Sequence, residues 1–308
     1  MRNAFADEVT QLAAQDARIV LLSGDIGNRL FDRLRAQSPS QFINCGVAEA
    51  NMMGVAAGMA LSGLRPITYT ITPFTTTRCL EQIRVDVAYH EAPVIIVGTG
   101  SGLSYASLGP THHSLEDFAI LRAIPNMRIL APWDAPSLRD VLKQSLRDTT
   151  PTYIRIGKKG EKDILPGSDV AALGRLTQLV KGEKVAIVAV GTVASEAVRA
   201  AEELKRVGIA ATVSLAHTVK PLPEADLHGL FQTHQLIVTV EEHSLAAGFG
   251  ESCVSCMQRG GFARTVLPLG VSDMFLSKAG SQQYARRQTG IDSVAIVEAV
   301  RGFFANAS

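Results

Sequence analysis

Short runs of apolar residues alternate with amphipathic stretches along most of the chain, a pattern typical of α/β proteins. In the first half, the predicted strands are 18–23, 41–45, 65–71, 93–98, 127–131 and 152–156. The predicted helices are 1–17, 29–36, 48–62, 77–90, 115–123 and 135–148. Strands that alternate with helices indicate a mainly parallel sheet with helices on both faces.

The alternation stops at a polar, glycine-containing stretch and then resumes. Residues 158–183 are therefore predicted to be a linker between domains. After it, the predicted strands are 184–190, 210–215, 235–240 and 265–268, and the predicted helices are 193–207, 223–232, 246–259, 281–287 and 291–304. We expect two doubly wound α/β domains, 1–157 and a smaller one at 184–308.

Composition excludes several classes of protein. With 308 residues, 46% of them hydrophobic and 19% charged, the chain is long enough for two cores. A net charge of +1 provides no electrostatic attraction for nucleic acid or an anionic membrane. No apolar run reaches the roughly 20 residues that span a bilayer. Four cysteines in so long a chain do not form a disulfide framework, so we expect a cytoplasmic protein.

The predicted helix 48–62 is built almost wholly of small and apolar residues and begins with one carboxylate, Glu49. A helix this apolar on nearly all sides belongs in a core or at a subunit interface. A carboxylate in the first turn also gains from the helix dipole. On this stretch alone, Glu49 fits a helix-terminal charge and a functional group equally well.

Other candidate site residues follow the predicted strands at the edge where α/β sheets bind ligands. Asp25, Phe74 and the loop 99–113 fall there together with Glu49. The loop ends in His112 and His113, and adjacent residues rarely both face a core. We therefore expect at least one of these histidines to face a site.

Three other patterns are weaker. The run 98–103 has leucine where a dinucleotide-binding motif needs its last glycine. Cys253 and Cys256 have the spacing of a zinc pair but lack a second pair of ligands, so we expect buried thiols on a helix face. The run 241–243, Glu-Glu-His, lacks further ligands and favours a structural or interface role. We predict no metal site on this chain.

Two motifs together resemble a known family. GVAEANMMGVAAGMALSG at 46–63 and GPTHHSLEDFAILRAIPNMRILAPWD at 109–134 resemble the pyrimidine-binding domain of the thiamine-diphosphate enzymes of the transketolase group. That group includes deoxyxylulose-phosphate synthase and the beta subunits of 2-oxo acid dehydrogenases. The segment 184–308, with VKPL, VTVEEH and AGFGE, resembles the C-terminal domain of the group. Over essentially its whole length, the chain looks most like the C-terminal subunit of a split bacterial transketolase.

The resemblance implies a cofactor shared between subunits. The GDG…N motif of the domain that binds diphosphate and metal does not occur in this sequence, and the run 24–27 (Gly-Asp-Ile-Gly) is not a substitute for it. We therefore expect thiamine diphosphate to lie across an interface, with Mg²⁺ or Ca²⁺ on a separate N-terminal transketolase subunit. Homodimerisation through helix 48–62 is expected to complete an α2β2 enzyme.

The same resemblance implies roles for cofactor-site residues. Glu49 would hydrogen-bond N1′ of the aminopyrimidine, so that the 4′ nitrogen can remove the thiazolium C2 proton. His112 would bind hydroxyls or the developing alkoxide of the sugar, and His113 would assist. Phe74 and Tyr69 are candidates for stacking on the pyrimidine. Asp25 is a further candidate for binding the cofactor.

Cations are candidates for the substrate side. Arg78 resembles an arginine that deoxyxylulose-phosphate synthase directs toward its substrate. Lys158, with Arg155 close by, falls where family members hold a sugar-phosphate arginine. Cations here suit phosphate or another anionic tail. The lysine ammonium is a point charge, however, and cannot bind an oxyanion through two nitrogens as an arginine guanidinium does. A solvated linker pair of Lys158 and Lys159 fits the sequence equally well.

Two departures from the family pattern concern specificity. Other transketolases have aspartate at the position of Leu108 and histidine at that of Gly100. These changes favour a modified or secondary-pathway sugar over ordinary pentose phosphates. The expected function is transfer of a two-carbon ketol unit between sugars. The alternatives are the beta subunit of a 2-oxo acid dehydrogenase and a non-catalytic assembly subunit.

Overall fold

The protein, seen here as a computed structural model, forms two α/β domains; the structure describes residues 1–158, 160–164 and 170–306. The first domain is built on a seven-stranded sheet, in the order β10-β5-β6-β4-β3-β1-β2. Its strands are β1 (Ile19–Ser23), β2 (Phe42–Asn44), β3 (Arg65–Ile71), β4 (Ile95–Thr99), β5 (Arg128–Leu130), β6 (Thr152–Ile156) and β10 (Thr218–Lys220). All neighbours pair in parallel except β10, which is antiparallel to β5.

Helices cover both faces of this sheet because its strands are apolar on both sides. On β1, Leu21 packs in the cluster of Phe5, whereas Leu22 packs in that of Met52. The first cluster is covered by α1 (Arg2–Gln15), α2 (Asp32–Gln37) and α7 (Ala135–Ser145). The second is covered by α3 (Glu49–Leu61), η4 (Ile83–Tyr89) and α6 (Asp117–Arg122). This arrangement confirms the predicted doubly wound fold.

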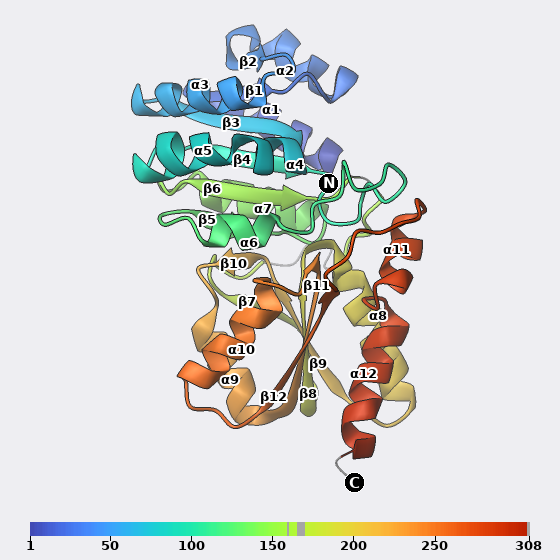
Figure 1. Ribbon diagram of the computed structural model, residues 1–308. Coiled ribbons are helices and arrows are strands. Elements are labelled where there is room, and N and C mark those ends of the chain that lie inside the picture. The colour runs from blue at the N-terminus through green and yellow to red at the C-terminus, as the bar shows by residue number, and fades with distance from the viewer. Residues whose placement is uncertain (159, 165–169, 307–308) are drawn as a thin grey trace.

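The second domain repeats the architecture on a five-stranded sheet, in the order β12-β11-β8-β9-β7. Its strands are β7 (Leu176–Val180), β8 (Lys184–Val190), β9 (Ala211–Ala216), β11 (His234–Ser244) and β12 (Thr265–Val271). One face is covered by α8 (Ala194–Arg206) and α12 (Ser293–Asn306), and the other by α9 (Glu224–Thr233) and α10 (Phe249–Arg259). The short α11 (Gln282–Gln288) lies near the junction with the first domain (Figure 1).

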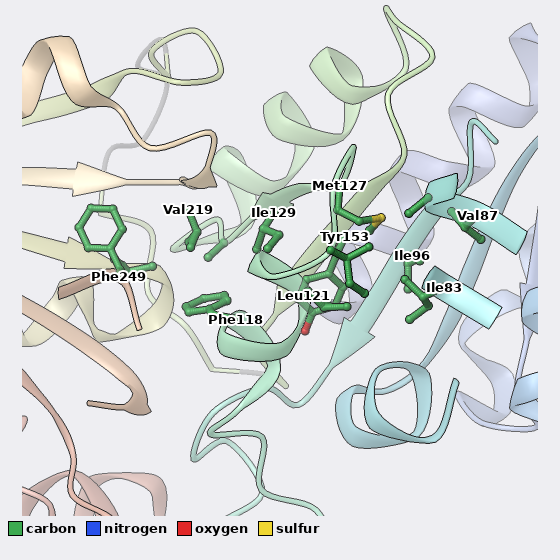
Figure 2. Packing of buried hydrophobic residues seen from close by; sticks show 14 of the residues in the cluster. Ile83, Val87, Ile96, Phe118, Leu121, Met127, Ile129, Tyr153, Val219 and Phe249 are labelled. Carbon is green, nitrogen blue, oxygen red and sulfur yellow. The ribbon is translucent and has the colours of Figure 1, made fainter. Parts of the chain in front are cut away.

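The two domains share one continuous core. Strand β10 belongs to the second half of the chain but pairs with β5 of the first sheet. Around it, Phe118 and Ile129 of the first domain pack in the same cluster as Val219 and Phe249 of the second (Figure 2). The domains therefore hold each other in a defined position. The loop 100–113 of the first domain contacts the second, so this position also fixes the surroundings of the loop.

Besides the strand β10, which was not predicted, the structure differs from the predicted elements in two places. Instead of one helix over 77–90, the chain forms α4 (Thr72–Thr75), η3 (Thr77–Cys79), α5 (Leu80–Gln82) and the π-helical η4. Helical backbone is interrupted at Thr76, where ψ is −80°, within a run of β-branched threonines that disfavour a helix. Within the predicted linker 158–183, residues 176–180 form β7, antiparallel to β9. Residues 159 and 165–169 of that linker lie outside the described residues.

Candidate functional site

The carboxyl edge of the first sheet gathers most of the residues singled out from the sequence. Glu49 begins α3 directly after β2, Phe74 lies on α4 after β3, and the loop 100–113 follows β4. The parallel pairing of these strands places their carboxyl ends at one edge. The structure thus brings together side chains that are far apart in the sequence.

Glu49 is a buried carboxylate with one charged partner. Its exposed fraction is 3%, and its Oε2 accepts a hydrogen bond from Nη1 of Arg78 at 2.9 Å. No hydrogen bond to Oε1 occurs within the described part of the chain. Gly24 leaves space for this carboxylate, because a Cβ there would lie 3.4 Å from Cγ of Glu49 and 3.0 Å from Oγ1 of Thr70.

From Glu49, a continuous row of contacts runs along the edge. The guanidinium carbon of Arg78 lies 4.2 Å from the ring centroid of Phe74. The ring of Phe74 meets that of His112 edge to face, with centroids 5.5 Å apart. His112 in turn meets the ring of Tyr105 at 5.8 Å, and Nζ of Lys158 lies 4.6 Å from the centroid of Tyr105. We name these side chains the site row: Glu49, Arg78, Phe74, His112, Tyr105 and Lys158.

The two histidines of the loop differ in environment. His112 is half-buried, and its Nδ1 shares a hydrogen bond of 2.9 Å with Oγ1 of Thr111, which leaves Nε2 for another partner. His113 is 6% exposed, and burial lowers its pKa below the ordinary value. Its buried Nε2 has no hydrogen-bond partner among the described residues. His112 therefore lies in the site row and His113 lies behind it.

Tyr105 is the member of the row that sequence reasoning missed. Gly100 has a φ of +73°, and a Cβ there would lie 1.8 Å from Cε2 of Tyr105. The loop can close over this ring only because residue 100 is glycine. The available signal was that Tyr105 is the lone aromatic residue in a loop of glycines and serines ahead of two histidines.

Besides His113, three expected site residues are not in the row. Tyr69 is fully buried, stacked on Phe5 with centroids 5.2 Å apart, and burial raises its pKa to about 12. Its ring is committed to the core and has no free face for a ligand. Asp25 is exposed, and its Oδ1 accepts a hydrogen bond from Nδ2 of Asn44 at 2.9 Å. It lines a cavity of about 220 Å³ together with Arg35.

Arg155, the third, joins the domains. It is 6% exposed, pairs with Asp117 at 3.1 Å, and donates from Nη2 to the carbonyl oxygens of Ser114 and Glu242 at 2.8 and 2.7 Å. Its charge is balanced by Asp117 and its Nη2 is bound to two backbone carbonyls, so the half-buried Lys158 is the more accessible of the two cations at this end of the row. Lys159 lies outside the described residues.

The Glu-Glu-His run of β11 supports the loop and α10 from the second domain. Glu242 accepts a hydrogen bond from the backbone N–H of Leu103 at 3.1 Å and pairs with Arg286. A Cβ on Gly102 would lie 2.6 Å from Oε2 of Glu242, so the loop needs glycine here as well. Glu241 accepts from the N–H groups of Phe249 and Gly250 at the start of α10.

Metal and membrane signals are absent from what the structure describes. Among the described residues, no group of three or more His, Cys, Asp or Glu side chains could hold a metal ion. Cys253 and Cys256 are buried on α10, as the sequence predicted. No helix in the described part of the chain has the length and apolar character needed to cross a membrane.

Comparisons with known proteins cover nearly the whole chain. Residues 1–160 match the family model of the transketolase pyrimidine-binding domain, and residues 174–296 match that of the transketolase C-terminal domain. The 6-deoxy-6-sulfo-D-fructose transketolase subunit SqwH of Clostridium sp. (strain MSTE9) is 36% identical over 97% of this chain and 92% of its own length. An apulose-4-phosphate transketolase subunit from Phocaeicola vulgatus is 34% identical over 83% of both chains.

Solved structures agree with this result. A split-gene transketolase, described as an inactive beta4 tetramer, is 30% identical with a TM-score of 0.88 and aligns over 98% of this chain and 96% of its own. Both domain models and relatives of nearly equal length match in the same order along the sequence. The chain therefore belongs to the transketolase family, a family of thiamine-diphosphate-dependent transferases, and consists of its pyrimidine-binding domain followed by its C-terminal domain.

Proposed function

We propose that this chain is the pyrimidine-binding subunit of a heteromeric transketolase that transfers a two-carbon ketol unit between sugars. The observation that carries the proposal is the site row, in which a buried carboxylate, an aromatic ring and an accessible histidine follow one another along the sheet edge. Its residues come from the segments that the family model of the pyrimidine-binding domain matches.

The residues of the row fit an aminopyrimidine. Glu49 offers a buried carboxylate with a free oxygen at the start of α3, where the helix dipole favours negative charge. The half-buried ring of Phe74, which Arg78 links to Glu49, can cover an aromatic ligand. Arg78 now lies over this ring, so a ligand that stacks there must displace it. The half-exposed guanidinium has solvent into which it can turn.

Each side chain of the row then has a distinct task. Thiamine diphosphate, when bound, supplies a nucleophilic carbon and an electron sink for carbon–carbon cleavage. Glu49 binds and exchanges a proton with the ring nitrogen N1′ of the cofactor. Phe74 orients the ring. Nε2 of His112 binds the substrate oxygen that changes charge, and His113, kept neutral by burial, supports the loop from behind.

The diphosphate and its Mg²⁺ or Ca²⁺ are proposed to bind on a separate subunit. The sequence has no GDG…N motif, and the described residues hold no metal-ligand cluster. The split-gene relative, described as an inactive beta4 tetramer, supports both self-association and the need for a partner. On this chain, α3 exposes a stripe of small or apolar residues, among them Val55, Gly58 and Leu61, which suits a homodimer interface within an α2β2 enzyme.

The proposed substrate is a modified sugar with an anionic tail. Leu108 stands where other transketolases have an aspartate, which speaks against ordinary pentose phosphates. The two named relatives act, by their names, on a sulfonated and a phosphorylated sugar. Arg78 and Lys158 provide positive charge at separate points of the row. A cytoplasmic location is also proposed, which the four free cysteines support.

Reconstitution tests this function. The chain is purified alone and together with the separate protein that carries the GDG…N motif, and thiamine diphosphate binding is measured by calorimetry with Mg²⁺. We expect the chain alone to bind thiamine diphosphate weakly and to show no two-carbon transfer. The complex should bind the cofactor tightly and transfer the two-carbon unit. Tight, magnesium-dependent binding by the chain alone would refute the two-subunit arrangement. Acyl transfer to a lipoyl acceptor would instead indicate a 2-oxo acid dehydrogenase. A complex that forms but does not bind the cofactor would indicate that this chain is a non-catalytic assembly subunit.

A further inference from the structure

The end of the site row opposite Glu49 carries hydrogen-bond donors without acceptors. The ring of Tyr105 is largely buried, with 8% of the residue exposed, and its hydroxyl makes no hydrogen bond with any described residue. Nζ of Lys158 has no carboxylate within salt-bridge distance among the described residues. Nε2 of His112 is likewise without a partner in the described chain.

This set of groups selects for one kind of ligand chemistry. A lysine ammonium can only donate hydrogen bonds, and the neighbouring phenol and imidazole can donate as well. A sugar hydroxyl is best bound where an acceptor is also present, and the carboxylate of Glu49 lies at the other end of the row, beyond Phe74 and Arg78. A group that offers only acceptors and carries negative charge satisfies all three donors. Phosphate and sulfonate are such groups.

Tyr105 controls the shape of this end of the row as well as its hydrogen bonding. Its ring occupies the volume that any side chain at position 100 would need, since a Cβ there would approach its ring atoms to 1.8 Å. The same ring supports Nζ of Lys158 at 4.6 Å and contacts His112 at 5.8 Å. Moving the ring would therefore change both the space available to a substrate and the position of the lysine.

We propose that Tyr105 is a specificity-determining residue, whose hydroxyl binds the terminal oxyanion of the sugar together with the ammonium of Lys158. The inference rests on the proposed function for the identity of the ligand as a sugar. The anion site itself rests on donors that have no acceptor among the described residues and on the fit of Tyr105 over Gly100. The oxyanion is the shared chemistry of a phosphorylated and a sulfonated substrate.

Anion binding is tested first, because it does not require activity. Calorimetry on the full chain uses inorganic phosphate and methanesulfonate as probes. Tyr105→Phe keeps the ring and removes only the hydroxyl, so we expect folding to be preserved and affinity to fall about tenfold, the loss typical of one hydrogen bond to a charged group. Lys158→Met should weaken binding at least as much. Tyr89→Phe and Lys205→Met, at exposed positions, are the matched controls.

Turnover by the reconstituted complex then tests specificity. For Tyr105→Phe, KM for a phosphorylated or sulfonated sugar should rise about tenfold, while kcat and the KM of the neutral sugar remain within about twofold. If inorganic phosphate binds more tightly than methanesulfonate, the oxyanion of the substrate is a phosphate, and the reverse order indicates a sulfonate. Equal phosphate affinity in wild type and Tyr105→Phe, or an equal loss on neutral and anionic sugars, would overturn the assignment. Tyr105-dependent anion binding in a complex that transfers no two-carbon unit would support the site but refute the proposed function.

Discussion

The guanidinium of Arg78 donates a hydrogen bond to the carboxylate of Glu49 across 2.9 Å. The two partners differ in environment, since Glu49 is 3% exposed and the side chain of Arg78 is 46% exposed. A buried carboxylate without a cation is costly, and here the cation is one that solvent can reach. Arg78 can thus stabilise Glu49 in the separate chain and still leave when another partner binds there.

Glu49→Gln tests the role of the carboxylate. Glutamine keeps the size of the side chain and can hydrogen-bond a ring nitrogen, but it cannot exchange a proton with it. In the reconstituted complex, the rate of C2 proton exchange on bound thiamine diphosphate should fall by about a hundred- to ten-thousand-fold. Glu81→Gln, at a side chain 70% exposed, is the control. Wild-type exchange in Glu49→Gln with cofactor bound would refute the assignment of this residue.

His112→Ala separates substrate chemistry from cofactor activation. His112 contacts Phe74 and Tyr105 through its ring but does not touch Glu49 in the site row. Two-carbon transfer should therefore drop by about a hundredfold or more, as for loss of a positioned acid–base group. C2 exchange should stay within about threefold of wild type. A parallel loss of both rates would mean that His112 acts on the cofactor site instead.

Arg155→Met tests whether Arg155 is structural. Removing the guanidinium leaves the carboxylate of Asp117, which is 1% exposed, without its cation. We expect a loss of about 3–5 kcal/mol in the free energy of unfolding, measured in urea. The exposed Arg147→Met should change it little. Normal stability combined with weakened phosphate affinity would instead place Arg155 at the substrate, as the family resemblance implied.

The buried imidazole of His243 makes a predictable contribution to the pH dependence of stability. Its Nε2 accepts from the N–H of Ala119 at 3.2 Å, Nδ1 donates to the carbonyl of Ser244 at 2.7 Å, and burial lowers its pKa from 6.5 to about 4. Below pH 6.5 the unfolded chain takes up a proton that the folded chain does not. The contribution of His243 is therefore complete above about pH 6.5 and is lost as the pH falls toward 4.

His243→Gln measures this contribution. Between pH 7 and pH 5, the wild-type free energy of unfolding should fall by about 2 kcal/mol more than that of the variant. The exposed His90→Gln should leave the pH profile unchanged. Superimposable profiles for wild type and His243→Gln would show that the imidazole titrates alike in both states.

Local pattern was sufficient for much of the fold. Apolar runs such as Ile19–Ser23 and Lys184–Val190 could be assigned as strands because both faces are buried, and their alternation with helices implied parallel sheets. The same rule placed Glu49 and the loop around His112 at one edge, because carboxyl ends of parallel strands meet there. These inferences need only the order of elements, which the sequence determines by itself.

Contacts between distant segments were decided by the tertiary structure. Periodicity shows which face of a strand is buried, but not what is packed against it. Tyr69 therefore looked like a ligand-facing aromatic residue until Phe5 was found stacked on it. Arg155 resembled a substrate cation although Asp117 balances its charge and its Nη2 donates to the carbonyl of Glu242. Tyr105 joined the site because Gly100 leaves room for its ring, a steric relationship that appears only when the loop closes in three dimensions.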